Sequence, residues 1–185
     1  MTTPLLCSAT HSRLLVIDIQ TRLAAAMPEA DRTRVLSNTT LLLQAATLLA
    51  IPTCVSEQYP KGLGPTEDEL TPYLPVSTQR IEKTCFSACS ADSFPHETAA
   101  GTQHVLAGME AHVCILQTAL QLHTRGQTVF VVEDAVCSRQ PDNTANALVR
   151  LRQAGVIVTN TESVIFEWLR DARHEHFKTL SALLR

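Results

Sequence analysis

The sequence lacks the features that mark membrane, secreted and nucleic-acid-binding proteins. No apolar run reaches the roughly 20 residues needed to cross a bilayer. The first 13 residues contain neither the positive segment nor the long apolar stretch of a signal peptide. With 15 Lys and Arg against 18 Asp and Glu, the formal net charge is −3, which provides no basic surface for nucleic acid. We therefore expect a cytoplasmic protein that binds neither a membrane nor nucleic acid.

The six cysteines form no recognisable disulfide or zinc motif. They lie at positions 7, 54, 85, 89, 114 and 137, and no two of them form a Cys-x-x-Cys pair. Cys85 and Cys89 are four residues apart, but no second Cys/His pair at zinc-finger spacing follows them. A chain of 185 residues, 45% of them hydrophobic, is large enough to fold around a core without disulfides. We expect free thiols in a single domain over residues 1–185.

The sequence does contain a regular alternation of strand-like and helix-like segments. Short apolar runs typical of buried strands occupy residues 13–20, 52–58, 78–83, 103–109, 128–134 and 156–159. Helical spacing extends over 31–50 and 114–124, a further helix runs from about Pro141 to a cap at Gly155, and residues 59–75 predict a loop with a short helix. The alternation predicts an α/β fold in three layers, with a six-stranded parallel, Rossmann-like sheet between helices.

Reactive side chains gather at the predicted carboxyl ends of these strands. The residues concerned are Asp18, Glu57, Lys83, the pair Glu133 and Asp134, and Cys114 just past the fourth strand. Open parallel sheets bind their ligands beyond the carboxyl ends of the strands, near the switch point. We expect the functional site among these residues.

Cys114 stands where a strand and a turn lead into a helix, a position that suits a nucleophile. A helix N-terminus lowers the pKa of a cysteine, and its free N–H groups can hold an oxyanion when a carbonyl is attacked. A buried, inert cysteine is nevertheless the more common outcome for one residue of this type taken alone. A catalytic Cys114 predicts a lowered pKa and faster labelling by iodoacetamide than at the other five cysteines.

Asp18 and Lys83 favour the catalytic reading of Cys114. Asp18 interrupts the apolar run "LLVIDIQ", where a carboxylate is costly unless it is paired or hydrogen-bonded. It either binds nearby backbone amides or acts as a general base for the thiol. A lysine at a strand end usually points into solvent, but if Lys83 faces Asp18, each offsets the desolvation of the other.

Four other positions carry weaker signals. His112 lies two residues before Cys114, so the two side chains point apart and His112 lines a pocket or caps the turn. The segment 57–59 lines the pocket or only ends a strand. Asp134 is expected to satisfy turn amides beside "AVCSR", and "HEHF" (174–177) is interpreted as a solvated surface.

Several motifs together resemble the cysteine hydrolases of the isochorismatase-like superfamily. "VIDIQ" is similar to the first-strand element of that family, "EKTCFSA" to its lysine segment and "GMEAHVC" to its nucleophile turn. "VEDAVCSR" and "TESVIFEWL" match later core elements, so the resemblance covers about residues 11–169. "SEQYPKGLGPT" and "GMEAHVCILQTAL" look most like the small isochorismatase domain-containing branch, whose substrates are largely undefined.

The resemblance implies roles for individual residues. Cys114 would be the nucleophile, Asp18 the base and Lys83 the third member of a triad. A cis peptide between Met109 and Glu110 would turn the backbone N–H groups of Glu110 and Cys114 toward the oxyanion. The residues taken as pocket walls are Gln20, Tyr59, Phe86 and His112.

One departure from the family bears on metal. The nicotinamidase branch binds a metal through an Asp-x-His and further histidines after the second strand, whereas "SEQYPKGLGPTEDEL" contains no histidine. We therefore expect no catalytic metal and no cofactor.

The resulting hypothesis is a hydrolase that cleaves a small carbonyl compound, most simply an amide, through a Cys114 thioester. Two alternatives stay open: a vinyl-ether hydrolase of the isochorismatase type, and a binding or scaffold protein that retains the fold. Family members usually form homo-oligomers, and the apolar "FKTLSALLR" at the C-terminus either joins such an interface or covers the core.

Overall fold

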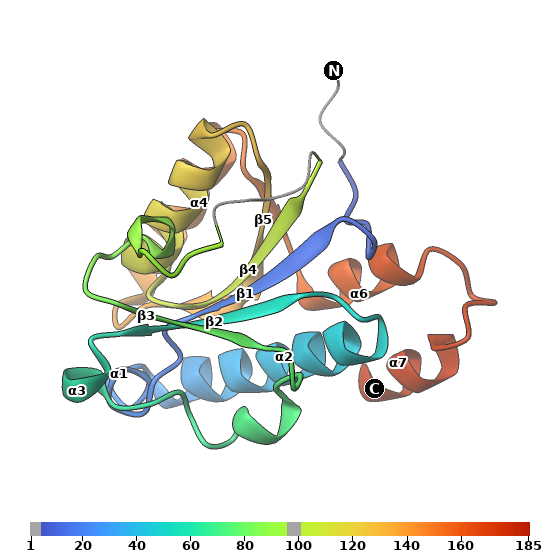
Figure 1. Cartoon of the computed structure of the whole chain (residues 1–185), viewed down its shortest axis with the longest axis horizontal. Helices are drawn as coiled ribbons and strands as arrows, with labels where there is room; N and C mark the ends of the chain where they lie inside the picture. Colours follow the sequence, from blue (N-terminus) through green and yellow to red (C-terminus); the bar gives the residue numbers. More distant parts are fainter. Residues whose placement is uncertain (1–4, 96–100) are drawn as a thin grey trace.

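The structure is a computed structural model that describes residues 5–95 and 101–185. Its centre is one six-stranded sheet in the order β3-β2-β1-β4-β5-β6, and every neighbouring pair is parallel (Figure 1). The strands are β1 (Ser12–Ile17), β2 (Thr53–Gln58), β3 (Gln79–Lys83), β4 (Gln103–Met109), β5 (Thr128–Cys137) and β6 (Ile157–Thr159). The predicted six-stranded parallel sheet is confirmed.

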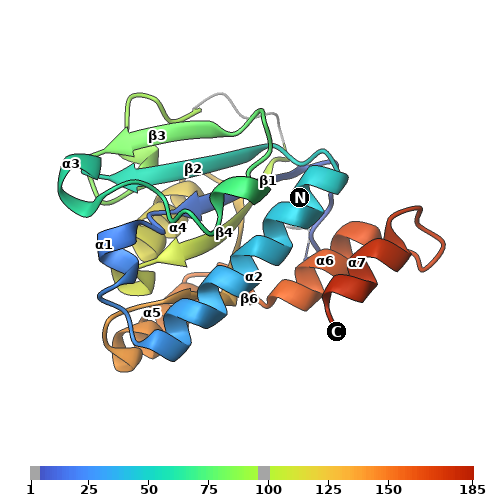
Figure 2. The ribbon, with the colours of Figure 1, turned by 90° about the horizontal axis from the view of Figure 1, so that it is seen from below.

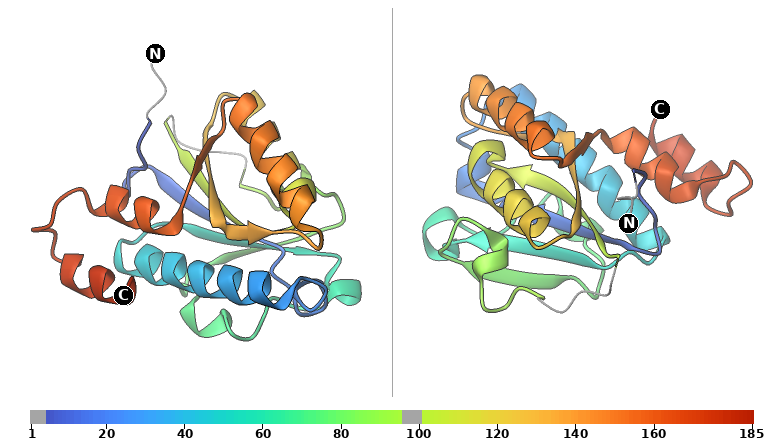
Figure 3. Two further views of the ribbon diagram at one scale, coloured as in Figure 1. Left: turned by 180° about the vertical axis from the view of Figure 1, so that it is seen from behind. Right: turned by 90° about the horizontal axis from the view of Figure 1, so that it is seen from above.

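Helices cover both faces of the sheet. One face carries α2 (Glu29–Leu48), α6 (Thr161–Leu169) and α7 (Phe177–Leu183), which Figure 2 shows from below. The other face carries α4 (Leu116–Thr124) and α5 (Pro141–Gln153), seen from above in Figure 3. Short helices α1 (Thr21–Ala24) and α3 (Pro60–Leu63) and a 3-10 turn at Thr71–Tyr73 lie in the connections. The three-layer arrangement is the predicted α/β fold.

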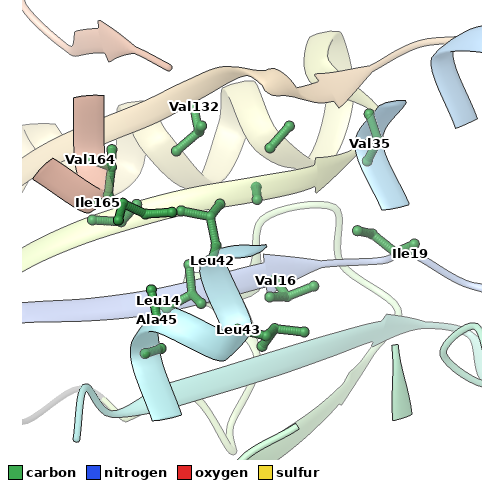
Figure 4. Close-up of a cluster of buried hydrophobic side chains, with 14 of the residues drawn as sticks. Leu14, Val16, Ile19, Val35, Leu42, Leu43, Ala45, Val132, Val164 and Ile165 are labelled. Carbon is green, nitrogen blue, oxygen red and sulfur yellow. The ribbon is translucent and has the colours of Figure 1, made fainter. Parts of the chain in front are cut away.

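The central strand β1 contributes to a core on each side of the sheet. Leu14 and Val16 pack toward α2 and α6, and Leu15 and Ile17 pack toward α4 and α5. Figure 4 shows the first of these cores. All four side chains are almost fully buried, and burial of an aliphatic side chain of this size stabilises the fold by roughly 1.5–3 kcal/mol. This two-sided burial explains the continuous apolar run in the sequence.

Helix α2 follows its predicted pattern closely. The positions Val35, Thr39, Leu42 and Ala46 are fully buried against the sheet. The helix runs two residues earlier at both ends than the predicted 31–50, beginning after Pro28.

The first strand is shorter than the predicted 13–20. It ends at Ile17 because Asp18 adopts a left-handed backbone conformation, with φ +52°. The N–H of Asp18 donates to the carbonyl of Ser56 on β2 (3.0 Å). The chain therefore turns out of the sheet at Asp18 itself.

The fifth strand is longer than the predicted 128–134, and Glu133 and Asp134 do not close it. Leu106 of β4 pairs with Val131, whereas Gly108 pairs with Val136, so β5 contains an irregularity between the two pairings. From α2, the Arg34 guanidinium donates to the carbonyls of Asp134 and Val136, and the Asn38 amide donates to that of Asp134. These donors satisfy carbonyl groups that the distorted ladder leaves free.

Asp134 also differs from its predicted role beside "AVCSR". Its Oδ1 accepts hydrogen bonds from the backbone N–H (2.9 Å) and the hydroxyl (2.8 Å) of Thr161. Thr161 is the first residue of α6. The carboxylate thus holds a helix start, where a negative charge is favourable, and lies outside the turn it was expected to serve.

Two further expectations concern the C-terminal segment and the question of a membrane span. Helix α7 covers the core, since its Leu180 is fully buried in the cluster beneath α2 and α6. Within the described residues, no helix combines the length and the apolar character that a membrane span requires.

Candidate active site

The site forms at the switch point of the sheet. The chain runs outward from β1 through β2 to β3 and then returns to lay β4 on the other side of β1. Asp18 follows β1 and Cys114 follows β4, so both lie where the strand order reverses. This is the place at which open parallel sheets bind ligands.

Gly108 allows β1 and β4 to approach each other at this point. Its φ is +132°, and a Cβ added there would lie 1.9 Å from the carbonyl oxygen of Ile17. Ile17 and Gly108 are partners in the β1–β4 register. The close approach sets the spacing between the residue after β1 and the turn after β4.

Asp18, Lys83 and Cys114 come together in the interior. The Nζ of Lys83 lies 2.7 Å from Oδ2 of Asp18 and 3.7 Å from Sγ of Cys114. The side chains of Asp18 and Lys83 are completely inaccessible to solvent, and Cys114 is 5% exposed. The ammonium group therefore lies beside both the carboxylate and the sulfur.

Asp18 has a second partner that the sequence reasoning did not name. The hydroxyl of Ser56 donates to Oδ1 at 2.7 Å, while Lys83 occupies Oδ2. A buried carboxylate needs such partners on its oxygens to offset its desolvation. Ser56 and Lys83 thereby fix the direction of the carboxyl group.

Lys83 has further acceptors from two neighbouring segments. Oε1 of Gln58 lies 2.6 Å from Nζ, and the carbonyl oxygen of Phe86 lies 3.2 Å from it. The sequence placed Gln58 in the segment 57–59, which was expected either to line the pocket or only to end a strand. The signal that identifies Ser56 and Gln58 is their alternate spacing on β2, next to a lysine on β3, which sets their side chains on one face.

The surroundings of Cys114 raise its pKa to about 12. Burial is the largest cause, the charge of Asp18 raises the pKa further, and the charge of Lys83 acts in the opposite direction. The lowered pKa predicted from the helix N-terminus is wrong, because burial and a neighbouring carboxylate outweigh that effect. Cys114 is therefore a thiol at neutral pH, and its proton must leave as the sulfur attacks.

Four other cysteines also have a raised pKa. Burial raises the pKa of Cys89 to about 11 and that of Cys137 to about 12, and it also raises those of Cys7 and Cys54. All six thiols are free, as predicted. What distinguishes Cys114 from these four is its contact with Asp18 and Lys83, and not its acidity.

The turn that carries Cys114 has an unusual backbone. The peptide between Met109 and Glu110 is cis, and Ala111–Ile115 form a π-helical turn that leads into α4. Oε2 of Glu110 accepts hydrogen bonds from the backbone N–H (2.9 Å) and Nε (3.1 Å) of Arg139. This pairing ties the turn after β4 to the segment after β5.

The residues taken as pocket walls lie in different surroundings. Gln20 is fully buried, and its amide bonds the backbone of Gln58 and Gly64, so it fastens the loop after β2. Tyr59 is 55% exposed and lines a cavity of about 380 Å³ beside α3. Phe86 is 53% exposed, next to the carbonyl contact with Lys83.

The side chain of His112 contacts residues near the start of α5 and is not a partner of Cys114. Its Nδ1 lies 2.9 Å from the hydroxyl of Ser138, and its Nε2 lies 3.4 Å from the amide nitrogen of Asn143. Both partners belong to the segment around the start of α5. His112 therefore links the nucleophile turn to that segment.

Glu57 organises the loop after β2. Oε1 of Glu57 accepts from the backbone N–H and hydroxyl of Thr66 and from Arg80. In the parts of the chain that the structure describes, no group of three or more His, Cys, Asp and Glu is placed to hold a metal ion. Glu57 thus ties together the loop after β2.

The chain matches one protein family over most of its length. Residues 12–163 match the family model described as Isochorismatase domain. Isochorismatase domain-containing protein 2 of Danio rerio is 38% identical over 182 residues, which cover 96% of this chain and 88% of that protein.

Several solved structures have the same fold as this chain. A Caenorhabditis elegans protein described as MAR1 ribonuclease has a TM-score of 0.90 at 36% identity, over 97% of this chain and 92% of that one. YcaC of Escherichia coli, described as an octameric hydrolase of unknown specificity, has a TM-score of 0.89 at 24% identity, over 100% and 91%. YcaC of Pseudomonas aeruginosa, solved with hexane-2,5-diol and covalent acrylamide, has a TM-score of 0.88 at 25% identity, over 97% of this chain and 90% of that one.

Proposed function

This chain belongs to the isochorismatase domain family of hydrolases, and from that premise we propose that it is a cysteine hydrolase of small carbonyl compounds, specifically amides. The observation that carries the proposal is the buried contact of Lys83 with both Asp18 (2.7 Å) and the sulfur of Cys114 (3.7 Å). A thiol beside a carboxylate and an ammonium has a base and a counter-charge at hand. The proposed steps use only groups of the chain, substrate and water.

In the first step, the carboxylate of Asp18 takes the proton of the Cys114 thiol as the sulfur attacks the substrate carbonyl carbon. The C=O bond opens to an oxyanion, which the N–H groups of Glu110 and Cys114 are proposed to hold. Lys83 stabilises negative charge on the sulfur while the proton moves. Because the pKa of Cys114 is raised to about 12, proton transfer and C–S bond formation are expected to occur together.

The second half of the reaction releases the products. The oxyanion collapses, the C–N bond breaks, and the amine leaves with the proton held by Asp18. A thioester on Cys114 remains. Asp18 then takes a proton from water, the resulting hydroxide attacks the thioester, and the acid leaves as the Cys114 sulfur recovers its proton.

Replacement of the nucleophile tests the proposal. With an amide or ester found by library screening, Cys114→Ala is expected to lower kcat/KM on the order of 10³-fold or more while the melting temperature shows that the fold is kept. Cys137→Ala, another buried thiol outside the triad, is the matched control and should retain activity. Unchanged turnover in Cys114→Ala would contradict the mechanism, and full activity in Cys114→Ser would favour vinyl-ether hydrolysis instead.

One structural relative, YcaC of P. aeruginosa, was solved with covalent acrylamide. Acrylamide adds to thiols through its carbon–carbon double bond. It is therefore a suitable first probe for Cys114 before a substrate is known.

RNA is the second substrate to test, since the 36% identical C. elegans protein is described as a ribonuclease. The net charge of this chain favours the amide reaction, because a charge of −3 provides little attraction for a phosphate backbone. Cleavage of single-stranded RNA by the wild type, and the loss of that cleavage in Cys114→Ala, would favour RNA over amides as the substrate.

We infer further that the chain assembles with copies of itself. The support is the octameric state described for E. coli YcaC, which shares the fold. Size-exclusion chromatography with light scattering is expected to give a mass that is a multiple of the 20.2 kDa chain mass. A mass of one chain at micromolar concentration would contradict the inference.

A further inference from the structure

Gln58 lies next to the buried lysine at the end of its own strand. Gln58 closes β2, Lys83 closes β3, and the two are partners in the strand register. Oε1 of Gln58 is 2.6 Å from Nζ of Lys83, as short as the 2.7 Å contact between Nζ and Asp18. The ammonium is therefore held from two sides, by a carboxylate on β1's end and by an amide on β2's end.

The amide of Gln58 is itself fixed in orientation. Its Nε2 donates to the carbonyl of Thr84 at 2.7 Å, which leaves Oε1 directed at the ammonium. The backbone of Gln58 is held by the buried Gln20, whose Oε1 accepts from the Gln58 N–H and whose Nε2 donates to the Gln58 carbonyl. An ammonium has only donors, so chemistry as well as geometry selects the oxygen of Gln58 as its partner.

An uncharged acceptor in this position has a specific effect. A lysine ammonium has three protons to donate, and Asp18, Gln58 and the carbonyl of Phe86 accept at 2.7, 2.6 and 3.2 Å. These contacts hold Nζ 3.7 Å from the Cys114 sulfur. Because the amide is neutral, it supports the cation without cancelling the charge that the sulfur experiences.

We propose that Gln58 is a positioning residue that acts through Lys83: it holds the ammonium between Asp18 and Cys114 and so controls the reactivity of the thiol. The inference rests on the proposed function, in which Lys83 stabilises charge on the sulfur. Gln58 touches neither the sulfur nor the carboxylate in this arrangement. Its effect on Cys114 is therefore conveyed by Lys83 and should disappear when Lys83 is absent.

A double-mutant cycle tests this dependence. The measured quantity is the rate constant for alkylation of Cys114 by iodoacetamide at pH 8, resolved by peptide mass spectrometry, in the chain of residues 1–185. Gln58→Met removes the acceptor and should slow alkylation about tenfold, the change that corresponds to one pKa unit. In a Lys83→Met background, the same replacement should leave the rate unchanged.

Gln79→Met is the matched control. Gln79 begins β3 at the opposite end of the strand from Lys83, and its amide donates to the carbonyl of Ser93. This variant should alkylate at the wild-type rate. A slowing by Gln58→Met that persists in the Lys83→Met background would show that Gln58 acts structurally and would overturn the proposal, as would a wild-type rate in Gln58→Met itself.

If Lys83→Met does not fold, a variant that adds a charge at position 58 tests the role of Gln58 instead. Gln58→Glu keeps the size and the acceptor but adds a negative charge beside the ammonium, and it should slow alkylation at pH 8 about tenfold. A wild-type rate in Gln58→Glu would overturn the proposal. None of these measurements needs a substrate, so they remain informative even if Cys114→Ala fails to abolish hydrolysis and the proposed function falls.

Discussion

At the scale of single residues, Cys114 is defined by its neighbours. Several buried cysteines share its raised pKa, and charges of both signs also act on Cys7 and Cys137. Cys114 differs in that its two charged neighbours, Asp18 and Lys83, form an ion pair whose side chains are completely buried. The sequence predicted the three residues from their types and from the motifs around them. It missed Ser56, and it gave Gln58 no role beyond a segment that lines the pocket or ends a strand. Hydroxyl and amide side chains at strand ends are common, and their role becomes visible only through the buried charges they contact.

Asp18→Asn separates the two effects of the carboxylate. The negative charge of Asp18 raises the pKa of Cys114, so its removal lowers that pKa and increases the thiolate fraction at pH 8. Iodoacetamide is therefore expected to label Cys114 faster in the variant by several-fold, while hydrolysis is lost because the base is gone. Peptide-resolved labelling and turnover are measured side by side. Slower labelling in Asp18→Asn would contradict the assigned electrostatics.

At the scale of elements, the helices and strands with continuous patterns were predictable. The carboxyl ends of β2, β3 and β4 at residues 58, 83 and 109 were predicted as well, but the ends of β1 and β5 were not. β1 stops at Asp18 because of a left-handed residue whose N–H reaches β2, and β5 continues because donors from α2 satisfy its distorted backbone. Both depend on partners far away in sequence. Local propensity and periodicity therefore predict the six strands but not the points at which β1 and β5 end.

Gly108 provides the test at this scale. Gly108→Ala places a Cβ 1.9 Å from the carbonyl oxygen of Ile17, so β1 and β4 must separate, and we expect a loss of about 3 kcal/mol or more in unfolding free energy. Gly126→Ala is the matched control, because Gly126 also has a positive φ (+76°) but open space around it; it should cost about 1 kcal/mol. Urea denaturation measures both. Equal losses in the two variants would show that the close approach is unimportant.

At the scale of the whole molecule, the buried thiols couple stability to alkaline pH. We propose that residues 1–185 unfold as one unit. Five cysteines have folded-state pKa values raised above 9.0: Cys7, Cys54, Cys89, Cys114 and Cys137. In the unfolded chain these thiols ionise near pH 9, while in the folded protein they stay protonated, so the unfolded state binds fewer protons as pH rises.

The direction of the change in stability with pH follows from these raised pKa values. The free energy of unfolding should be insensitive to these groups below about pH 8 and should fall steeply above pH 9, by at most ~1.4 kcal/mol per pH unit for each thiol. Melting temperatures across pH 7 to 11, for wild type and Cys137→Ala, measure the trend. The variant should lose less stability than the wild type over the alkaline range. A flat profile to pH 11 would contradict the burial of these thiols.

The most direct test of the central claim is to trap the acyl group on Cys114. The protein is mixed with an amide or ester that it hydrolyses, quenched in acid during turnover, digested and analysed by mass spectrometry. We predict that the peptide containing Cys114 gains the mass of the acyl group, that hydroxylamine removes it, and that no other cysteine peptide is modified. Turnover at a steady rate with an unmodified Cys114 peptide, and the same rate in Cys114→Ala, would contradict the account.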